Sequence, residues 1–334
     1  MKENGIRTIK EVAKLAGVSP AAVSRYINGG SISEEKRERV RRAIEETGYR
    51  PNPMARTMRT GRTDQIGVIV PRIYSDSVSQ IVAGATQKLS EHSYMPILGC
   101  TDHSIEKEVE YLHIMQEKQV SGIILMGTML TPENTEAIRG CRVPIVITGQ
   151  NYEGLPCVCH DDFHAVRELT RLMIEKGRRR IVMIGAPDGD IAAGLNRRRG
   201  AEQALLDAGF DPSAMVCEVS TFEARGGREA MNRLLQKCPD LDGVVCATDT
   251  MAMGAMAALK EAGKRIPEDV SIVGVGDSWV DEVSSPSLTT ARLFFRQCGE
   301  EAAGLMLDII NGGVEDMTAR TIRLRYKIME RNSV

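Results

Sequence analysis

Residues 8–28 read TIKEVAKLAGVSPAAVSRYIN, and this stretch decides the architecture of the first part of the chain. Thr8 and Glu11 are spaced as in a capping box, in which each residue satisfies a free backbone N–H at the start of a helix. Gly17 is expected to end that helix, because glycine readily adopts the positive φ of a helix C-terminus. The stretch therefore predicts a first helix between Thr8 and Gly17.

Two further helices are predicted after this one. Ser19 and Pro20 are typical of an N-cap and a first helical residue, and the helix they begin should run to about Asn28. Ser33 caps a third helix that ends before Gly48. A short turn between two helices, followed by a third packing helix, indicates a helix-turn-helix unit. Its expected core consists of apolar positions: Ile9, Val12, Ala13, Leu15, Val18, Val23, Ile27, Val40 and Ile44.

Charge is distributed unevenly along the 334-residue chain, whose net charge is only −2. Residues 1–62 contain four lysines and ten arginines against seven glutamates, whereas the remainder has an excess of nine negative charges. A basic head on an acidic body indicates that the head meets a polyanion. Ser24, Arg25 and Asn28 form a polar outer face on the second helix, as a recognition helix presents to base edges. A three-helix protein-binding module is the alternative that these residues leave open.

The quoted stretch closely resembles the head of the lac repressor (LacI/GalR) family of transcriptional regulators. The resemblance continues through residues 48–56 (GYRPNPMAR) and 66–71 (IGVIVP), and reaches residues 330–333 (ERNS). It implies a sequence-specific DNA-binding regulator, a repressor of a metabolic operon for carbohydrate use, controlled by a small molecule. Some motifs lean toward the sucrose- and trehalose-type members of the family.

The resemblance also implies a set of residues that contact DNA. Pro20 and Ala21 occupy the two positions that vary most with operator sequence, and Ala22 stands where the family commonly has threonine. Arg25 keeps the base-contacting arginine of the family. The complete expected set is Thr8, Ser19, Pro20, Ala21, Ala22, Ser24, Arg25, Asn28, Tyr49, Asn52, Ala55, Arg56 and Met58.

Residues 51–62 resemble the hinge helix of the family, although a plain linker remains the alternative. The segment is too short and too polar to be a stable helix alone. By resemblance, it folds when two copies pack in the minor groove and Met58, where the family usually has leucine, wedges into a base step. The implied partner is therefore a pseudo-palindromic double-stranded operator bound by a homodimer. The chain ends soon after Arg331, without the heptad tail that would make a tetramer.

Strand and helix patterns alternate from residue 66 onward, which predicts an α/β fold of doubly wound parallel sheets. The expected strands are residues 66–70, 95–99, 122–126, 144–148, 180–184, 243–247 and 271–275. Two successive sets of strands indicate two lobes with a cleft that closes like a hinge. The family has this build, similar to periplasmic sugar-binding proteins, and its chain crosses between lobes three times, here near residues 161, 291 and 323.

These considerations give a predicted domain organisation. A helix-turn-helix domain occupies residues 1–50, the hinge residues 51–62, and the effector-binding and dimerisation core residues 63–334. Within the core, the boundaries follow the three crossings. The first lobe is expected at about 63–161 and 292–322, and the second at about 162–291 and 323–334.

Strand-end residues are the candidate contacts to an effector, a sugar or sugar derivative by resemblance. Arg197 matches the ligand-binding arginine of the family, and glycines at 149 and 276 replace two aspartates that are common in it, so a simple galactoside or ribose pocket is not expected. Alternatives remain for some candidates: Arg197 as a surface charge, Phe222 and Trp279 as packing, and Asp249 as a helix cap. The expected set is Ser75, Gln150, His160, Arg197, Phe222, Thr248, Asp249, Asp277 and Trp279.

Other classes of protein are disfavoured by the sequence. No apolar stretch follows the first charges and no run reaches the about 18 residues of a membrane span, so we expect a cytoplasmic protein rather than a secreted solute-binding protein. Phosphate-loop, zinc-protease and serine-hydrolase motifs are missing, which argues against an enzyme. Neither cofactor nor metal is expected, because Cys157 and Cys159 are spaced too closely for a zinc knuckle, and His160 and His164 should not share a helical face.

Overall fold

The computed structural model describes residues 8–27, 30–49, 63–127, 129, 131–312 and 320–334. The chain divides into two compact units, residues 1–63, called the head, and residues 64–334, called the core. Among the described residues, no helix is long and apolar enough to cross a membrane.

The described residues of the head form three helices: α1 (Ile9–Ala16), α2 (Pro20–Ile27) and α3 (Glu34–Thr47). The backbone N–H of Thr8 donates to Glu11 Oε2 at 2.8 Å, and Gly17 ends α1 with φ 62°. The backbone N–H of Ala22 donates to Ser19 Oγ at 3.2 Å, so Ser19 caps α2. The three helices predicted from the cap residues are therefore confirmed.

The head has a small hydrophobic core of its own, built from residues of all three helices: Val12, Ala13, Ala16, Val23, Val40 and Ala43. The prediction that Leu15 belongs to this core is wrong, because its side chain is 49% exposed. Helix residues are rotated by about 100° from one to the next. Leu15 consequently lies about 100° from the centre of the face that Val12, Ala13 and Ala16 bury.

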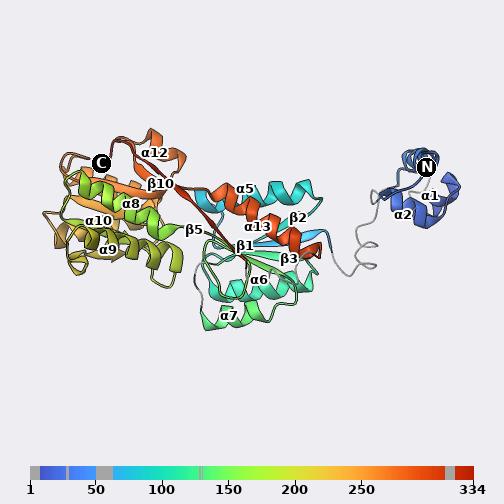
Figure 1. Ribbon diagram of the computed structural model, residues 1–334, viewed down its shortest axis with the longest axis horizontal. Coiled ribbons are helices and arrows are strands. Elements are labelled where there is room, and N and C mark those ends of the chain that lie inside the picture. The colour runs from blue at the N-terminus through green and yellow to red at the C-terminus, as the bar shows by residue number, and fades with distance from the viewer. Residues whose placement is uncertain (1–7, 28–29, 50–62, 128, 130, 313–319) are drawn as a thin grey trace. The chain divides into compact units, whose positions relative to one another are not determined.

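Two six-stranded sheets form the core, and each defines a lobe (Figure 1). In lobe 1 all pairings are parallel, and the strand order is β11 (Thr321–Leu324), β5 (Cys157–His160), β4 (Ile145–Thr148), β3 (Gly122–Met126), β1 (Gln65–Val70), β2 (Met95–Cys100). In lobe 2 only the β10–β12 pair is antiparallel, and the order is β12 (Tyr326–Met329), β10 (Thr289–Leu293), β9 (Ser271–Gly276), β8 (Gly243–Cys246), β6 (Ile181–Gly185), β7 (Cys217–Val219). The predicted α/β class with two parallel-dominated sheets is confirmed.

Helices cover both faces of each sheet. In lobe 1, α5 (Asp76–Glu91) and α13 (Phe295–Ile310) lie on one face, and α6 (Ile105–Glu117) and α7 (Pro132–Arg139) on the other (Figure 1). Glycines let α5 and α13 pack closely, because a Cβ at Gly84 would lie only 2.0 Å from the carbonyl oxygen of Arg296. The lobe 2 helices are α8 (Asp162–Glu175), η1 (Ile191–Asn196), α9 (Arg197–Asp207), η2 (Pro212–Ala214), α10 (Ala224–Lys237), α11 (Asp249–Glu261) and α12 (Trp279–Val283).

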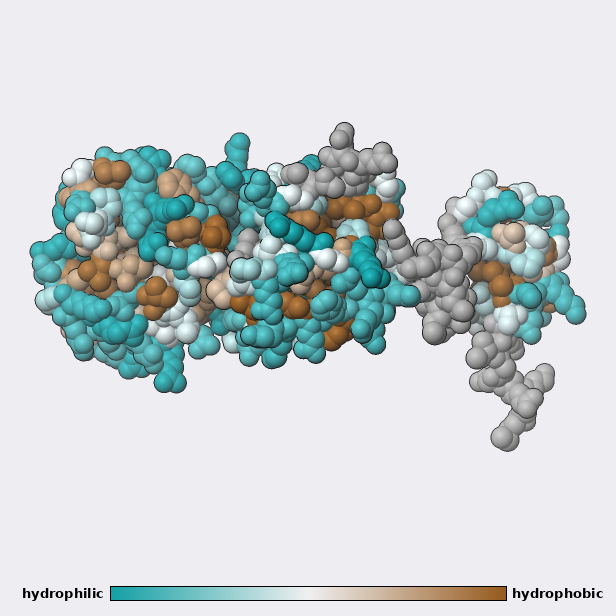
Figure 2. All heavy atoms as spheres, turned by 90° about the horizontal axis from the view of Figure 1, so that it is seen from below, coloured by the Kyte–Doolittle hydropathy of each residue, from teal (hydrophilic) through white to brown (hydrophobic). Residues whose placement is uncertain are grey.

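Alternation of side chains along the strands supplies both faces of a sheet with apolar residues. In β6, Ile181 and Met183 belong to a cluster with α8 and α9, whereas Val182 and Ile184 belong to one with α10 and α11. On the face of the core shown in Figure 2, hydrophobic residues also reach the surface in separate patches between hydrophilic ones.

Three chain crossings connect the lobes. The first is at Asp161, between β5 of lobe 1 and α8 of lobe 2. The second is at Phe294 and the third at Arg325, because β10 continues its pairing with lobe 2 and β11 its pairing with lobe 1 up to those residues. The strand pairings thus place the last two crossings two or three residues beyond the predicted positions at 291 and 323.

Candidate nucleic-acid interface and ligand cavity

The outer face of α2 and the residues before it are accessible in the head. Thr8, Ser19, Pro20, Ala21 and Arg25 are exposed. The rest of the expected contact set falls into three groups. Ser24 and Tyr49 are half-buried. Ala22 is only 8% exposed, on the side of α2 that also buries Val23, and it lines a hollow on the head. Asn28, Asn52, Ala55, Arg56 and Met58 lie outside the described residues.

A hollow on the head is surrounded by cationic side chains. Lys14, Arg25 and Lys36 line it, together with the start of α2 around Ser19, and the described lining residues include no acid. The N-terminus of a helix carries partial positive charge and free N–H groups, which also favour anions. This surface can therefore bind phosphate groups beside the start of α2.

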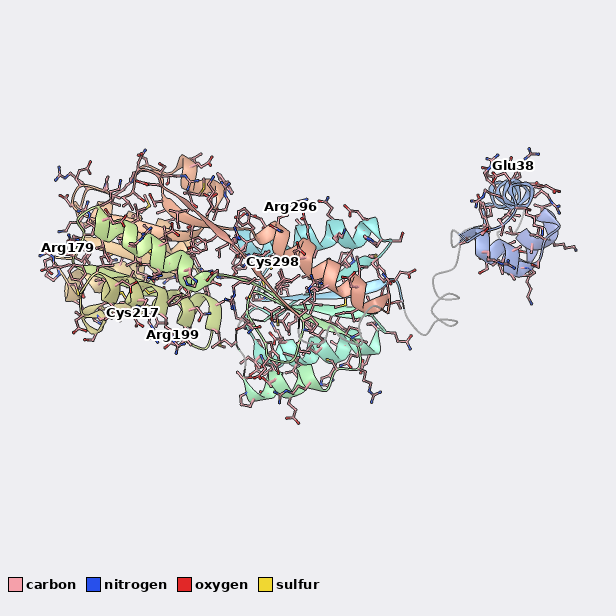
Figure 3. The ribbon with its side chains drawn as sticks, in the orientation of Figure 1. Glu38, Arg179, Arg199, Cys217, Arg296 and Cys298 are labelled. Carbon is pink, nitrogen blue, oxygen red and sulfur yellow. The ribbon has the colours of Figure 1, made fainter. Side chains whose placement is uncertain are left out.

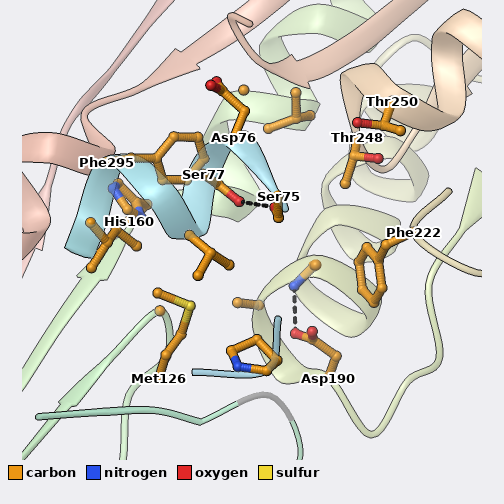
Figure 4. A pocket seen from close by; sticks show the side chains of 18 of the residues that line it. Ser75, Asp76, Ser77, Met126, His160, Asp190, Phe222, Thr248, Thr250 and Phe295 are labelled. Atoms are coloured by element: carbon orange, nitrogen blue, oxygen red, sulfur yellow. Dashed lines mark hydrogen bonds between the residues drawn. The ribbon is translucent and has the colours of Figure 1, made fainter. Parts of the chain in front are cut away.

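A cavity of about 160 Å³ lies in the core and is lined by residues of both lobes (Figure 4). Lobe 1 contributes residues that end or follow β1, β3 and β5, among them Ser75 after β1, Met126 at the end of β3 and His160 at the end of β5. Lobe 2 contributes residues that follow β6, β8 and β9, among them Thr248. The cavity thus lies at the carboxyl ends of the strands, where ligands bind in open parallel sheets.

Arg197 lies at this cavity in a buried ion pair. Its Nε and Nη2 are 2.8 Å and 2.7 Å from Asp162 Oδ1, and Nη1 donates to the carbonyl oxygen of Ala247. The side chains of Arg197 and Asp162 are only 8% and 3% exposed. The alternative that Arg197 is a surface charge is therefore excluded.

Phe222 joins the two lobes at the wall of the cavity. The Arg72 guanidinium of lobe 1 lies 5.7 Å from the Phe222 ring centroid, and its Nη2 donates to the Phe222 carbonyl oxygen at 3.2 Å. His103, also of lobe 1, stacks on the same ring with 6.0 Å between centroids. Arg72 Nη1 is also 3.7 Å from Glu223 Oε1. We call Arg72, His103, Phe222 and Glu223 the interlobe latch; sequence reasoning missed both lobe 1 members.

Three more of the expected residues line the cavity. Ser75 begins α5, and its hydroxyl is 2.9 Å from Ser77 Oγ. Thr248 caps α11, because its Oγ1 accepts from the Met251 N–H at 3.3 Å, so Asp249 is not that cap. His160 is 7% exposed, and its Nε2 has no hydrogen-bond partner among the described residues. Burial lowers the pKa of His160, which keeps the imidazole neutral.

Asp249 lines the cavity, but both of its carboxylate oxygens already accept hydrogen bonds from other residues of the protein. Its Oδ1 accepts from Thr290 Oγ1 at 2.6 Å, and its Oδ2 accepts from the Ser278 N–H at 3.2 Å. The fully buried Asp281 carboxyl group lies against it, and burial together with Asp249 raises the pKa of Asp281 to about 9. Burial thus raises the pKa of both carboxyl groups, and we expect the pair to share one proton, held by Asp281.

Replacement of Asp281 by asparagine is expected to stabilise the core above about pH 4. Because the folded-state pKa is raised, the contribution of Asp281 to the free energy of unfolding is complete below that pH and declines as pH rises toward about 9. An amide makes the same hydrogen bond without ionising. The free energy of unfolding of Asp281→Asn should exceed that of the unmodified protein by more than about 1 kcal/mol at about pH 8, as measured by urea unfolding.

The matched control is Asp277→Asn, whose effect should have the opposite sign. Asp277 Oδ2 is 2.5 Å from Arg292 Nε, and Oδ1 is 2.6 Å from Arg331 Nη2, so the substitution removes the charge from two ion pairs. Equal stability changes at all pH values for Asp281→Asn would contradict the shared-proton assignment.

Three expected effector contacts lie outside the lining of this cavity. Asp277 is committed to the two arginines just described, and its side chain is 5% exposed. Trp279 is 72% exposed on α12 beside the 70% exposed Val283, so its predicted stacking on a ligand is not supported. Gln150 is 2% exposed, its Nε2 donates to the Gly127 carbonyl oxygen at 2.7 Å, and it lines a neighbouring hollow instead.

The cysteine and histidine side chains considered for zinc do not converge. Cys157 Sγ accepts from the Tyr152 N–H at 3.1 Å, and burial raises the pKa of its thiol to about 11. His164 instead contacts Asp161, with 2.8 Å between Nδ1 and Oδ1. In the described part of the chain, no group of three or more ligating side chains could hold a metal ion, and all eight cysteines are free. Cys217 and Cys298 lie in different lobes (Figure 3).

Two family models match the chain. The model described as "Bacterial regulatory proteins, lacI family" matches residues 8–52, and that of a "Periplasmic binding protein-like domain" matches residues 170–334. The HTH-type transcriptional regulator RegA of Clostridium saccharobutylicum is 33% identical over 98% of this chain and 98% of its own length. The chain belongs to the LacI family of bacterial transcriptional regulators. It is accordingly a DNA-binding regulator with an allosteric effector domain and not an enzyme, as the sequence predicted.

Solved structures of LacI-family proteins share the fold. A structure of the transcriptional regulator CelR in complex with cellobiose has a TM-score of 0.75 at 32% identity, over 98% of this chain and 100% of that one. The lac repressor dimer bound to operator and an anti-inducer has a TM-score of 0.87 at 23% identity, over 98% and 99%. At the latter identity the likeness concerns the fold alone.

Proposed function

We propose that this LacI-family chain is a homodimeric repressor of a carbohydrate-utilisation operon and binds a pseudo-palindromic operator. A neutral sugar in the core cavity changes its affinity for that operator. The observation that carries the proposal is the cavity itself, which joins two lobes and is lined by Arg197, Phe222, Thr248, Ser75 and His160. Hydroxyl, imidazole and guanidinium groups around an aromatic ring suit a polyol with an apolar ring face. Because the proposed partner is operator DNA, we place the protein in the cytoplasm.

The charges around the cavity favour a neutral effector over a phosphorylated one. Arg197 is already neutralised by Asp162, and Arg72 contacts Glu223 and the Phe222 carbonyl oxygen. An anionic effector would therefore have to break existing pairs in a region of low dielectric, which costs several kcal/mol for a buried pair. The structure of CelR with cellobiose supports a sugar as the class of effector.

Direct contact of the head with bases is assigned to the exposed face of α2. Arg25 in the last turn of α2, together with Pro20, Ala21 and Ser24, is proposed to contact bases, while Thr8 and Ser19 at the starts of α1 and α2 are proposed to contact phosphates. Tyr49, Asn52, Ala55 and Arg56 remain predicted DNA contacts, and Met58 remains the predicted wedge. Two heads on one duplex require two copies of the chain.

Exposed apolar side chains on both lobes support the homodimer. Met95 and Leu98 of the edge strand β2 are 55% and 46% exposed, and Trp279 and Val283 of α12 are 72% and 70% exposed. Large apolar groups of this kind are typical of surfaces that a partner covers. We therefore infer that Trp279 packs against the second copy rather than against the effector.

The experiment that tests the function combines operator selection with effector screening. Duplexes selected from a random pool by the full-length protein should share an inverted repeat, and affinity for them should fall steeply as salt rises, because bound phosphates release counterions. Addition of a neutral sugar that raises the melting temperature should change that affinity. Equal binding to all duplexes, or sugar binding without any effect on DNA affinity, would refute the proposal.

The interlobe latch provides a prediction about closure. Arg72→Ala removes a hydrogen bond, an ion pair and a cation–π contact to Phe222, which together amount to about 1–2 kcal/mol. The closed form should become less populated, and effector affinity should fall by as much as about tenfold in calorimetric titration. Arg179→Ala is the matched control, because Arg179 makes the same kind of contact with Phe210, at 5.6 Å, outside the cavity. Unchanged affinity in Arg72→Ala would show that the latch does not control closure.

A further inference from the structure

A carboxylate outside the predicted contact set lies in the wall of the cavity. Asp190 precedes η1, and its Oδ1 accepts from the Ala193 N–H at 2.8 Å (Figure 4). The residue is 8% exposed and lines the cavity beside Phe222. Its position seven residues before Arg197 is set by the turn of η1 into α9, which brings both side chains to the same cavity.

The environment of Asp190 does not compensate its charge. Arg197 is the cation whose charge favours the ionised form of Asp190, but its guanidinium is already paired with Asp162. Asp190 itself forms no ion pair among the described residues. Burial therefore raises the pKa of Asp190 to about 6, although the Ala193 N–H and Arg197 oppose this effect. Asparagine would cap η1 about equally well without this desolvation cost. A buried, unpaired carboxylate that is not needed for the cap indicates a role toward the cavity.

Asp190 also fills a gap in the chemistry of the cavity. Positions 149 and 276 are glycine, so neither supplies a carboxylate, and Asp249 is held by Thr290 and Ser278. A carboxylate accepts hydrogen bonds from hydroxyl groups and, when charged, binds them about twice as strongly as a neutral acceptor does. We propose that Asp190 is a specificity-determining residue that accepts hydrogen bonds from hydroxyl groups of a neutral polyhydroxy effector. This inference rests on the proposed function.

The role implies a dependence of effector affinity on pH. Protonation turns one acceptor oxygen of Asp190 into a donor, so affinity should decline as pH falls through about 6. The other charged groups that line the cavity are Arg197, Asp162 and Asp249 in lobe 2 and Arg72 and Asp76 in lobe 1. Burial lowers the pKa of both His103 and His160, the histidines that line the cavity, which favours their neutral forms.

The test compares Asp190→Asn with Asp188→Asn in the full-length chain. Asp188 is close in sequence but pairs with Arg198 at 2.7 Å and does not line the cavity. The probes are neutral monosaccharides and disaccharides, including glucose, ribose, sucrose and cellobiose, ranked by thermal shift and then titrated calorimetrically. At about pH 8, Asp190→Asn should bind the best probe about tenfold or more weakly, whereas Asp188→Asn should remain within about twofold of the unmodified protein.

Two further readouts separate ligand contact from a purely structural cap. Without sugar, Asp190→Asn should melt at an equal or higher temperature at about pH 8, because it removes a buried charge. Between about pH 8 and pH 5 the affinity of the unmodified protein should fall by about tenfold, while that of Asp190→Asn stays constant. Unchanged affinity in Asp190→Asn, or parallel pH profiles of the two proteins, would overturn the role of Asp190 alone. Failure of every neutral sugar to bind the unmodified protein would overturn the proposed effector class and, with it, this inference.

Discussion

The core without residues 1–63 is expected to lose all measurable affinity for duplex DNA. Residues 1–62 carry four lysines and ten arginines against seven glutamates, whereas the rest of the chain has an excess of negative charge. Each phosphate neutralised by a cation contributes to binding through counterion release, so loss of the head removes essentially all of the electrostatic affinity. The decrease should be at least about 1,000-fold at low salt in a fluorescence-anisotropy titration of the selected operator.

The truncated core should nevertheless keep its response to effector. It is a compact unit with its own hydrophobic clusters, and every residue that lines the cavity lies within it. The thermal shift produced by the best sugar should therefore equal that of the full-length chain. Salt-dependent duplex binding that survives the truncation would contradict the assignment of the head as the DNA-binding part.

Replacement of Arg197 by alanine is expected to abolish effector binding and to destabilise the core. The substitution leaves the 3% exposed Asp162 carboxylate without its partner, and breaking one side of a buried ion pair typically costs about 3–5 kcal/mol of unfolding free energy. Arg199→Ala is the matched control. Arg199 lies two positions after Arg197 on the same helix, α9, but its side chain is exposed (Figure 3). It should leave stability and sugar binding nearly unchanged.

A double variant separates the two effects of Arg197. Arg197→Met together with Asp162→Asn removes both charges and keeps most of the volume, so the chain should recover most of the lost stability. Sugar binding should remain absent in calorimetry, because the guanidinium donors at the cavity are still missing. A double variant that folds and binds sugar with unchanged affinity would show that Arg197 serves only the ion pair.

Local sequence determined most of the elements. Cap and terminator residues such as Ser19 and Gly17 determined the three described head helices, and seven apolar runs determined seven strands, because capping and hydrophobic periodicity are properties of adjacent residues. The strands β5, β7, β10, β11 and β12 are not among the seven expected ranges. They are short and partly exposed or lie at crossings, and their pairing depends on partners far away in the chain.

Tertiary structure alone decided which strand-end residues form the site. The sequence placed Arg197, Phe222 and Thr248 at strand ends, and these line the cavity, but it placed Asp277 and Trp279 there equally. Which of these residues reach the cavity depends on contacts made after folding. Arg292 and Arg331 hold the Asp277 carboxylate in ion pairs, and Trp279 on α12 is exposed at the surface. Arg72, His103 and Asp190 escaped notice for the same reason. A side chain becomes a ligand contact when folding brings it to a shared cavity and buries its charge, and neither condition is encoded in its immediate neighbours.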